Sequence, residues 1–155
     1  MSNDFRILAA IDLQVGMDRV LMEVERHARA HDALVTLVHV AQPDPEFVGY
    51  LKSSGSDAQL QTDVKRIPKA EALRTERQHI QAIGETLRNK GLRVDDAITV
   101  QGSVLASILE MSRKLDADLL IMGSHQHGAF YRLVHGDTAA EAVTQAPCPV
   151  LVVPS

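Results

Sequence analysis

The chain of 155 residues has no tryptophan, three phenylalanines, two tyrosines and a single cysteine. So few aromatic side chains leave too few stacking platforms for a protein that binds single-stranded nucleic acid. Cys148 cannot form an internal disulfide, which agrees with a reducing compartment. A net charge of −4, with Lys and Arg scattered along the chain, gives no electrostatic footprint for nucleic acid or an anionic membrane.

Long apolar runs are also absent, and none approaches the roughly 20 residues that would span a bilayer. The first residues lack a basic region, an apolar stretch and a cleavage signal, so nothing marks the chain for export. The composition, 45% hydrophobic and 23% charged, is typical of a globular protein with one core. Residues 1–155 are therefore expected to form one cytoplasmic domain that binds neither nucleic acid nor membrane.

Apolar runs alternate with segments of helical periodicity along the chain. The runs that predict buried parallel strands are residues 5–12, 34–40, 92–101, 117–122 and 149–153. Helices are predicted at residues 17–31, 73–87, 104–115 and 138–145, with Ser103 as an N-cap and Gly91 near a C-cap. This alternation predicts an α/β fold, a single doubly wound five-stranded parallel sheet with helices on both faces.

The segment 41–68 breaks the alternation. Pro43, Pro45, Gly49 and the run 53–56, Ser-Ser-Gly-Ser, interrupt any period. We expect a loop or a partly ordered insertion here, and long loops of this kind either cover a site or are mobile.

The stretch 116–138 is the most informative for function. Its predicted strand ends at Met122 and leads into a loop that contains Gly123, Gly128 and Gly136. In an open α/β sheet a glycine-bearing turn beyond the carboxyl end of a strand is a common ligand site, because backbone N–H groups converge there. The three glycines permit a phosphate cradle, although glycines in this position are also ordinary turn residues.

Several segments together resemble the universal stress protein family over nearly the whole chain. They are ILAAID ending in Asp12, LVTLVHV ending in Val40, Gly102, the run from Ala117 to His125, and the closing APCPVLVVP. The resemblance implies a sheet in the order 3-2-1-4-5 and a homodimer formed through the last strand.

Family members that bind ATP carry a loop of Gly, two residues, Gly, nine residues, Gly, and then Ser or Thr. In this chain Gly123 and Gly136 match that pattern, whereas Gln126 and Asp137 occupy the other two positions. The resemblance also places Asp12 by the ribose and Val40 by the adenine. The candidate nucleotide-binding residues are therefore Asp12, Val40, Met122, Gly123, Gln126, Gly128, Gly136, Asp137 and Thr138.

Each polar candidate has a structural alternative. Asp12 could accept hydrogen bonds from ribose hydroxyls, or it could be a helix N-cap or a loop acid. Asp137, immediately before Thr138, could complement a helix dipole, and Gly128 could be only a turn residue. Because Gln126 resembles the replacement in relatives that do not bind ATP, the expected ATP binding is weak or absent.

Four histidines, His39, His125, His127 and His135, are expected on or near the rim of this site. The spacing of His125 and His127 could offer two imidazoles to Zn²⁺, but no carboxylate or Cys ligand stands at a helpful spacing, so no metal is expected. No nucleophile triad or carboxylate pair favours catalysis. We therefore expect a homodimeric stress-response regulatory module and not an enzyme; the alternative is a genuine ATP-binding switch with slow hydrolysis.

Overall fold

The computed structural model describes residues 3–13, 16–41, 56–124 and 143–154. In these ranges five strands are formed, β1 (Arg6–Ala10), β2 (Leu34–Ala41), β3 (Arg93–Gln101), β4 (Leu119–Ser124) and β5 (Val150–Pro154). The helices are α1 (Met17–His31), α3 (Ser56–Asn89) and α4 (Val104–Lys114). All five predicted strands are confirmed, with ends that differ from the expected ones by a few residues.

The strands form one parallel sheet in the order β3-β2-β1-β4-β5. Its centre is β1, in which Ile7 pairs with Val35 of β2 on one side and with Leu119 of β4 on the other. The expected doubly wound sheet and the order 3-2-1-4-5 are therefore both confirmed.

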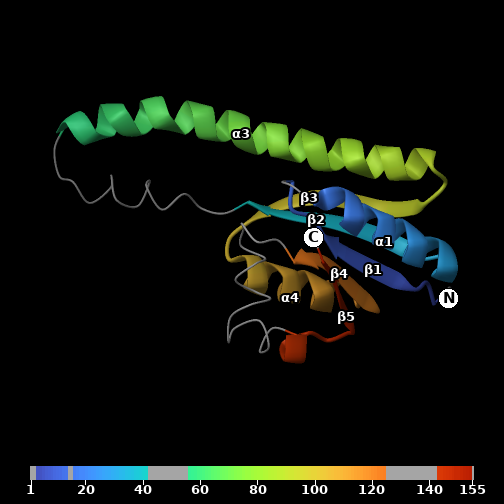
Figure 1. Cartoon of the computed structure of the whole chain (residues 1–155). Helices are drawn as coiled ribbons and strands as arrows, with labels where there is room; N and C mark the ends of the chain where they lie inside the picture. Colours follow the sequence, from blue (N-terminus) through green and yellow to red (C-terminus); the bar gives the residue numbers. More distant parts are fainter. Residues whose placement is uncertain (1–2, 14–15, 42–55, 125–142, 155) are drawn as a thin grey trace.

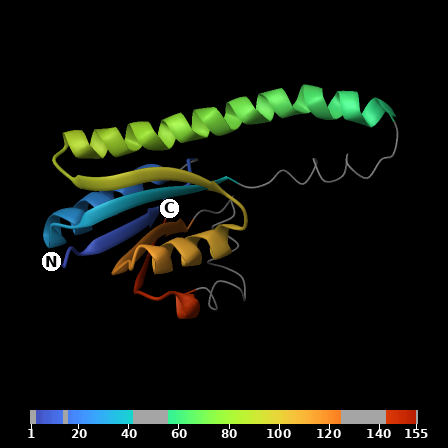
Figure 2. The same ribbon diagram turned by 180° about the vertical axis from the view of Figure 1, so that it is seen from behind.

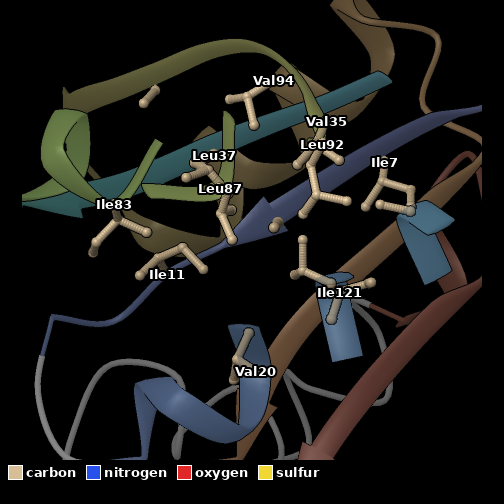
Figure 3. Close-up of a cluster of buried hydrophobic side chains, with 14 of the residues drawn as sticks. Ile7, Ile11, Val20, Val35, Leu37, Ile83, Leu87, Leu92, Val94 and Ile121 are labelled. Carbon is tan, nitrogen blue, oxygen red and sulfur yellow. The ribbon is translucent and has the colours of Figure 1, made fainter. Parts of the chain in front are cut away.

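Helices cover both faces of the sheet (Figures 1 and 2). Alternate residues of β1 point to opposite faces, as the pleat of a strand requires. Ile7 and Ala9 belong to the core beneath α1 and α3, whereas Leu8 and Ala10 belong to the core beneath α4. Figure 3 shows the first of these cores, where Ile83 and Leu87 of α3 point toward Ile11 and Leu37.

The long helix α3 corrects the expectation of a loop over residues 41–68. It begins at Ser56, and the expectation is wrong from that residue onward. The segment that follows Ser56 is rich in good helix formers such as Ala, Gln, Leu and Lys, and the helix continues on both sides of Pro68 despite the hydrogen bond and the favourable backbone packing that a proline costs it. Residues 42–55 lie outside the described ranges.

The amino-terminal part of α3 extends past the sheet at the end where β2 stops (Figures 1 and 2). The buried residues of the described part of α3 lie in its carboxyl-terminal turns, and they are Ile80, Ile83, Gly84 and Leu87. None of the helices in the described ranges is long and apolar enough to cross a membrane.

Of the two predicted helix caps, the one at Gly91 is confirmed, and the one at Ser103 is confirmed only in its position. Gly91 has a φ of 88°, and after α3 the Leu92 amide donates to the Leu87 carbonyl at 3.1 Å while the Gly91 amide donates to Arg88 at 2.9 Å, which is a Schellman C-cap. Ser103 is the N-cap residue of α4, but its side chain makes no capping hydrogen bond. Residues 143–145 are helical, and the rest of the predicted helix 138–145 lies outside the described ranges.

Candidate functional site

The connections of the sheet diverge between β1 and β4. From β1 the chain passes through α1 to β2 on one side, and from β3 it passes through α4 to β4 on the other side of β1. Neighbouring strands whose connections leave in opposite directions open a crevice beyond their carboxyl ends. The candidate site is therefore the edge where β1 ends at Ala10 and β4 ends at Ser124.

Asp12 lies at this edge, two residues beyond β1. The preceding residue is fixed to the sheet, because the Ile11 amide donates to the Val38 carbonyl at 2.8 Å. Asp12 is half-buried, and no described residue donates a hydrogen bond to its carboxylate. It is not the N-cap of α1, since that position belongs to Gly16 with a φ of 93°. Among the described residues, the carboxylate oxygens of Asp12 thus have no hydrogen-bond donor.

Val40 and Met122 lie on either side of the end of β1. Both are about 5% exposed and belong to the core beneath α4, as does Ala10 between them. Ala10 pairs in register with Val38 of β2 and with Met122 of β4. The side chains of Val40 and Met122 thus belong to the apolar core next to the carboxyl end of β1.

Gly123 lies inside β4 and not in the loop that the sequence predicted, because the strand continues to Ser124. It is buried, and a Cβ atom at this position would lie 3.0 Å from Cγ2 of Val20 in α1. Its φ is not in the left-handed region, unlike that of Gly16, Gly91 or Gly102. The close approach of α1 to β4 therefore favours glycine here.

The remaining candidates lie outside the described ranges: Gln126, Gly128, Gly136, Asp137 and Thr138. The same holds for His125, His127 and His135. In the part of the chain that the structure describes, no three side chains of the His, Cys, Asp and Glu types are grouped as a metal site requires.

His39 was expected on the rim, and the structure places it in the interior, 8% exposed. Its Nδ1 is 3.0 Å from the carbonyl oxygen of Ile11, and its Nε2 is 3.2 Å from Oε2 of Glu76 in α3. No local pattern singles out Glu76, because a partner 37 positions away follows only from how α3 packs. A buried polar side chain needs a hydrogen-bond partner, so the imidazole of His39 in a mostly apolar strand indicated that such a partner exists, although not which residue it is.

Cys148 precedes β5 and is half-buried. Burial raises the pKa of its thiol, and the nearby Asp118 carboxylate raises it further, while a backbone hydrogen bond involving Leu120 acts in the opposite direction. A thiol with a raised pKa is protonated near neutral pH and is a poor nucleophile.

A hollow of about 290 Å³ lies between α1 and α3. Its apolar lining comes from Leu21, Met22, Ile83 and Leu87. An ion pair of 3.2 Å joins Lys90 and Glu25, two of its polar lining residues. It belongs to the helix layer and not to the strand ends, so we do not assign it to the candidate site.

Together the fold and this edge define a doubly wound parallel α/β protein with a switch point between β1 and β4. The chain matches the Universal stress protein family over residues 5–154 and belongs to that family. A relative from Thermus aquaticus, the universal stress protein in the QAH/OAS sulfhydrylase 3′ region, is 30% identical over 148 residues, which cover 95% of this chain and 96% of the relative.

Solved structures share the fold. A protein of the universal stress protein family from Burkholderia pseudomallei has a TM-score of 0.66 at 21% identity and covers 100% of this chain and 99% of its own. The universal stress protein from Archaeoglobus fulgidus in complex with dAMP has a TM-score of 0.58 at 14% identity and covers 96% and 97%. At these identities the likeness concerns the fold alone.

Proposed function

We propose that this chain is a cytoplasmic, homodimeric regulatory module of the stress response, with a crevice that binds adenine nucleotides through their nucleoside part. The observation that carries the proposal is the Asp12 carboxylate, which receives no hydrogen bond from any described residue and lies where β1 ends. A ribose offers hydroxyl donors to such a carboxylate, and the apolar side chains of Val40 and Met122 at the same edge of the sheet are the surface that we propose for the adenine ring.

The ligands of two solved relatives support an adenine nucleotide. One is the Archaeoglobus fulgidus protein in complex with dAMP, and the other is a universal stress protein in complex with cAMP. Both ligands combine adenine with a single phosphate. The proposal for this chain is likewise a site whose affinity comes mainly from the nucleoside.

The phosphate end of the site is expected to be poor. Asp137 takes the place of a hydroxyl in the ATP-binding pattern, and a carboxylate about 4 Å from an anion costs up to about 4 kcal/mol at an effective dielectric near 20. Gln126 replaces a glycine and restricts the backbone angles that turn N–H groups toward a phosphate. A net loss of about 2.8 kcal/mol would weaken binding roughly a hundredfold.

Calorimetric titration of adenosine and of ATP, with and without Mg²⁺, tests the proposal. Native protein should bind adenosine and ATP with similar, weak affinities. The double variant Gln126→Gly with Asp137→Ser should gain affinity for ATP by one to two orders of magnitude and change little toward adenosine. Tight binding of ATP by native protein would favour the alternative, an ATP-binding switch with slow hydrolysis.

We propose further that the dimer forms through β5. This strand is at the edge of the sheet and pairs in the described chain with β4 alone. Val150, Leu151 and Val152 are only half-buried. A short apolar edge strand is a liability unless another chain covers it.

Sedimentation of Val152→Lys tests this interface, and Met22→Lys is a matched control on the exposed surface of α1, where Met22 is 69% exposed. Native protein and the control should sediment as dimers, and Val152→Lys should sediment as a folded monomer. A Val152→Lys dimer would place the interface elsewhere.

Catalysis is not part of the proposal. In the described ranges, no cluster of nucleophile, base and acid accompanies Asp12, and Cys148 has a raised pKa. A regulatory role through binding requires none of these groups. Sustained release of phosphate from ATP by purified native protein would contradict this part of the proposal.

A further inference from the structure

The imidazole of His39 joins three parts of the molecule that are distant in the sequence. It belongs to β2, its Nδ1 contacts the Ile11 carbonyl just beyond β1, and its Nε2 contacts Glu76 of α3. Both contacts have hydrogen-bond length, and the ring is almost completely buried. Ile11 directly precedes Asp12, so this ring lies next to the segment that presents the candidate ribose ligand.

The chemistry of the Ile11 carbonyl fixes the role of Nδ1. A backbone carbonyl can only accept a hydrogen bond, so Nδ1 carries the hydrogen. On its other side the ring presents Nε2 to the Glu76 carboxylate at 3.2 Å. The side chain of Glu76 therefore lies where it can orient the ring toward Ile11.

The position of this contact on α3 is informative. Glu76 lies one turn before Ile80, which is the first fully buried residue in the described part of the helix. The helix leaves the sheet in the direction of Ser56 (Figure 1). The pair of His39 and Glu76 therefore joins α3 to the sheet near the place where the helix departs from it.

We infer that His39 is a positioning residue that couples α3 to the ribose end of the nucleotide crevice. Glu76 orients the imidazole, the imidazole holds the Ile11 carbonyl, and Ile11 sets the place of Asp12. The inference rests on the proposed function for its effect on ligand binding. Its effect on the Ile11 segment is independent of any ligand.

Two substitutions of His39 separate its two contacts. The amide nitrogen of Asn can occupy the place of Nδ1, so His39→Asn retains a donor for Ile11 and loses the contact with Glu76. The amide nitrogen of Gln can occupy the place of Nε2, so His39→Gln retains the contact with Glu76 and loses the donor for Ile11. Thr99→Val is the matched control, because Thr99 pairs in register with His39 and its buried hydroxyl has no hydrogen-bond partner among the described residues.

The experiment is a double-mutant cycle in which Glu76→Ala is introduced into native protein and into the His39→Asn variant. The first readout is hydrogen exchange of the Ile11 amide, which donates to Val38, and the second is the Kd of adenosine. In native protein, Glu76→Ala should speed exchange and raise the Kd about five- to tenfold. In the His39→Asn variant it should change either quantity less than twofold, while His39→Gln alone should resemble Glu76→Ala and Thr99→Val should resemble native protein.

Equal effects of Glu76→Ala in both backgrounds would overturn the inference, because Glu76 would then act without His39. If native protein binds no adenosine, the proposed function fails, and the exchange cycle alone decides whether His39 couples the two segments. Adenosine could also bind while the two substitutions are non-additive in the hydrogen exchange of Ile11 but additive in the Kd of adenosine. His39 would then position Ile11 without influence on the ligand, and this result would also overturn the coupling to the crevice.

Discussion

The two edges of the parallel sheet differ in how their polar groups are satisfied. At the amino-terminal edge the Arg6 amide donates to the Asp118 carboxylate at 2.8 Å, and the Arg6 guanidinium donates to the Leu115 carbonyl at 2.9 Å. On the neighbouring side of this edge, Arg93 donates to the Asp32 carbonyl at 3.0 Å. At the carboxyl-terminal edge, Asp12 has no such donor among the described residues.

The polar contacts at the amino-terminal edge stabilise the fold, whereas the carboxylate at the carboxyl-terminal edge is the one that we propose for ligand binding. Arginines tie the loops of the amino-terminal edge to the strands, and their charge is already used by protein acceptors. A carboxylate with no donor among the described residues gains little stability from them, and its oxygen atoms can bind a ligand. The comparison assigns a structural role to Asp118 at one edge, and the proposal assigns a binding role to Asp12 at the other.

The largest expected effect concerns Gly123 at the carboxyl-terminal edge of the sheet, where the absence of a side chain lets α1 pack closely on β4. Gly123→Val should destabilise the protein by about 1–3 kcal/mol, since the added Cβ meets Val20. The double variant with Val20→Ala should lose less than the sum of the two single losses in urea unfolding. Additive losses would mean that the contact with Val20 does not explain the glycine.

The next effect concerns the amino-terminal edge of the sheet. Asp118→Ala should lower the free energy of unfolding by about 1 kcal/mol, because the Arg6 amide loses its carboxylate acceptor. Asp95→Ala, at an exposed position of β3, is the control and should change stability by less than about 0.5 kcal/mol. Indistinguishable urea midpoints for the two variants would remove the stabilising role assigned to this edge.

Asp12→Ala should give the reverse result. It should change stability by less than about 0.5 kcal/mol, since no described residue donates to the carboxylate. Its Kd for adenosine should rise about tenfold, which corresponds to about 1.4 kcal/mol. A variant that unfolds more readily but binds adenosine as native protein does would reverse the roles of the two aspartates.

The smallest effect is expected at Cys148, which is near Asp118 at the amino-terminal edge. Because burial and the Asp118 carboxylate raise the pKa of the thiol, the thiolate is scarce, and alkylation by iodoacetamide at pH 8 should be slower in folded protein than in urea. Asp118→Ala should lower this pKa and speed alkylation about twofold, a small change because solvent screens a partly exposed charge. Unchanged or slower alkylation in Asp118→Ala would contradict the assigned influence of the carboxylate.

The strands of the sheet could be predicted because each is marked by residues that are neighbours in the sequence. Each strand is a short apolar run, and the alternation with helices leaves few arrangements besides a parallel doubly wound sheet. The start of α3 was not predictable in the same way. Gly55 and Pro68 suggested an interrupted segment, yet the helix passes through Pro68 and begins directly after Gly55.

The site was predictable where a residue follows a strand and not where two elements pack together. Asp12 was identified from its place at the end of an apolar run and from the family resemblance. The role of Gly123 depends on how closely α1 approaches β4, and the pairing of His39 with Glu76 depends on how α3 lies on β2. Such contacts are set by tertiary packing, which no local pattern encodes.

The projection of α3 gives the molecule a lever arm. From Glu76 to Ser56 the helix measures about 30 Å at a rise of 1.5 Å per residue, and its opposite end is fixed by the buried residues Ile83 and Leu87. With a fulcrum at Glu76, a tilt of about 5° would displace the tip by about 3 Å, and Pro68 lies within this arm, at a residue type where helices kink most readily. A small rearrangement around the imidazole of His39 would thus be amplified at the amino-terminal end of α3.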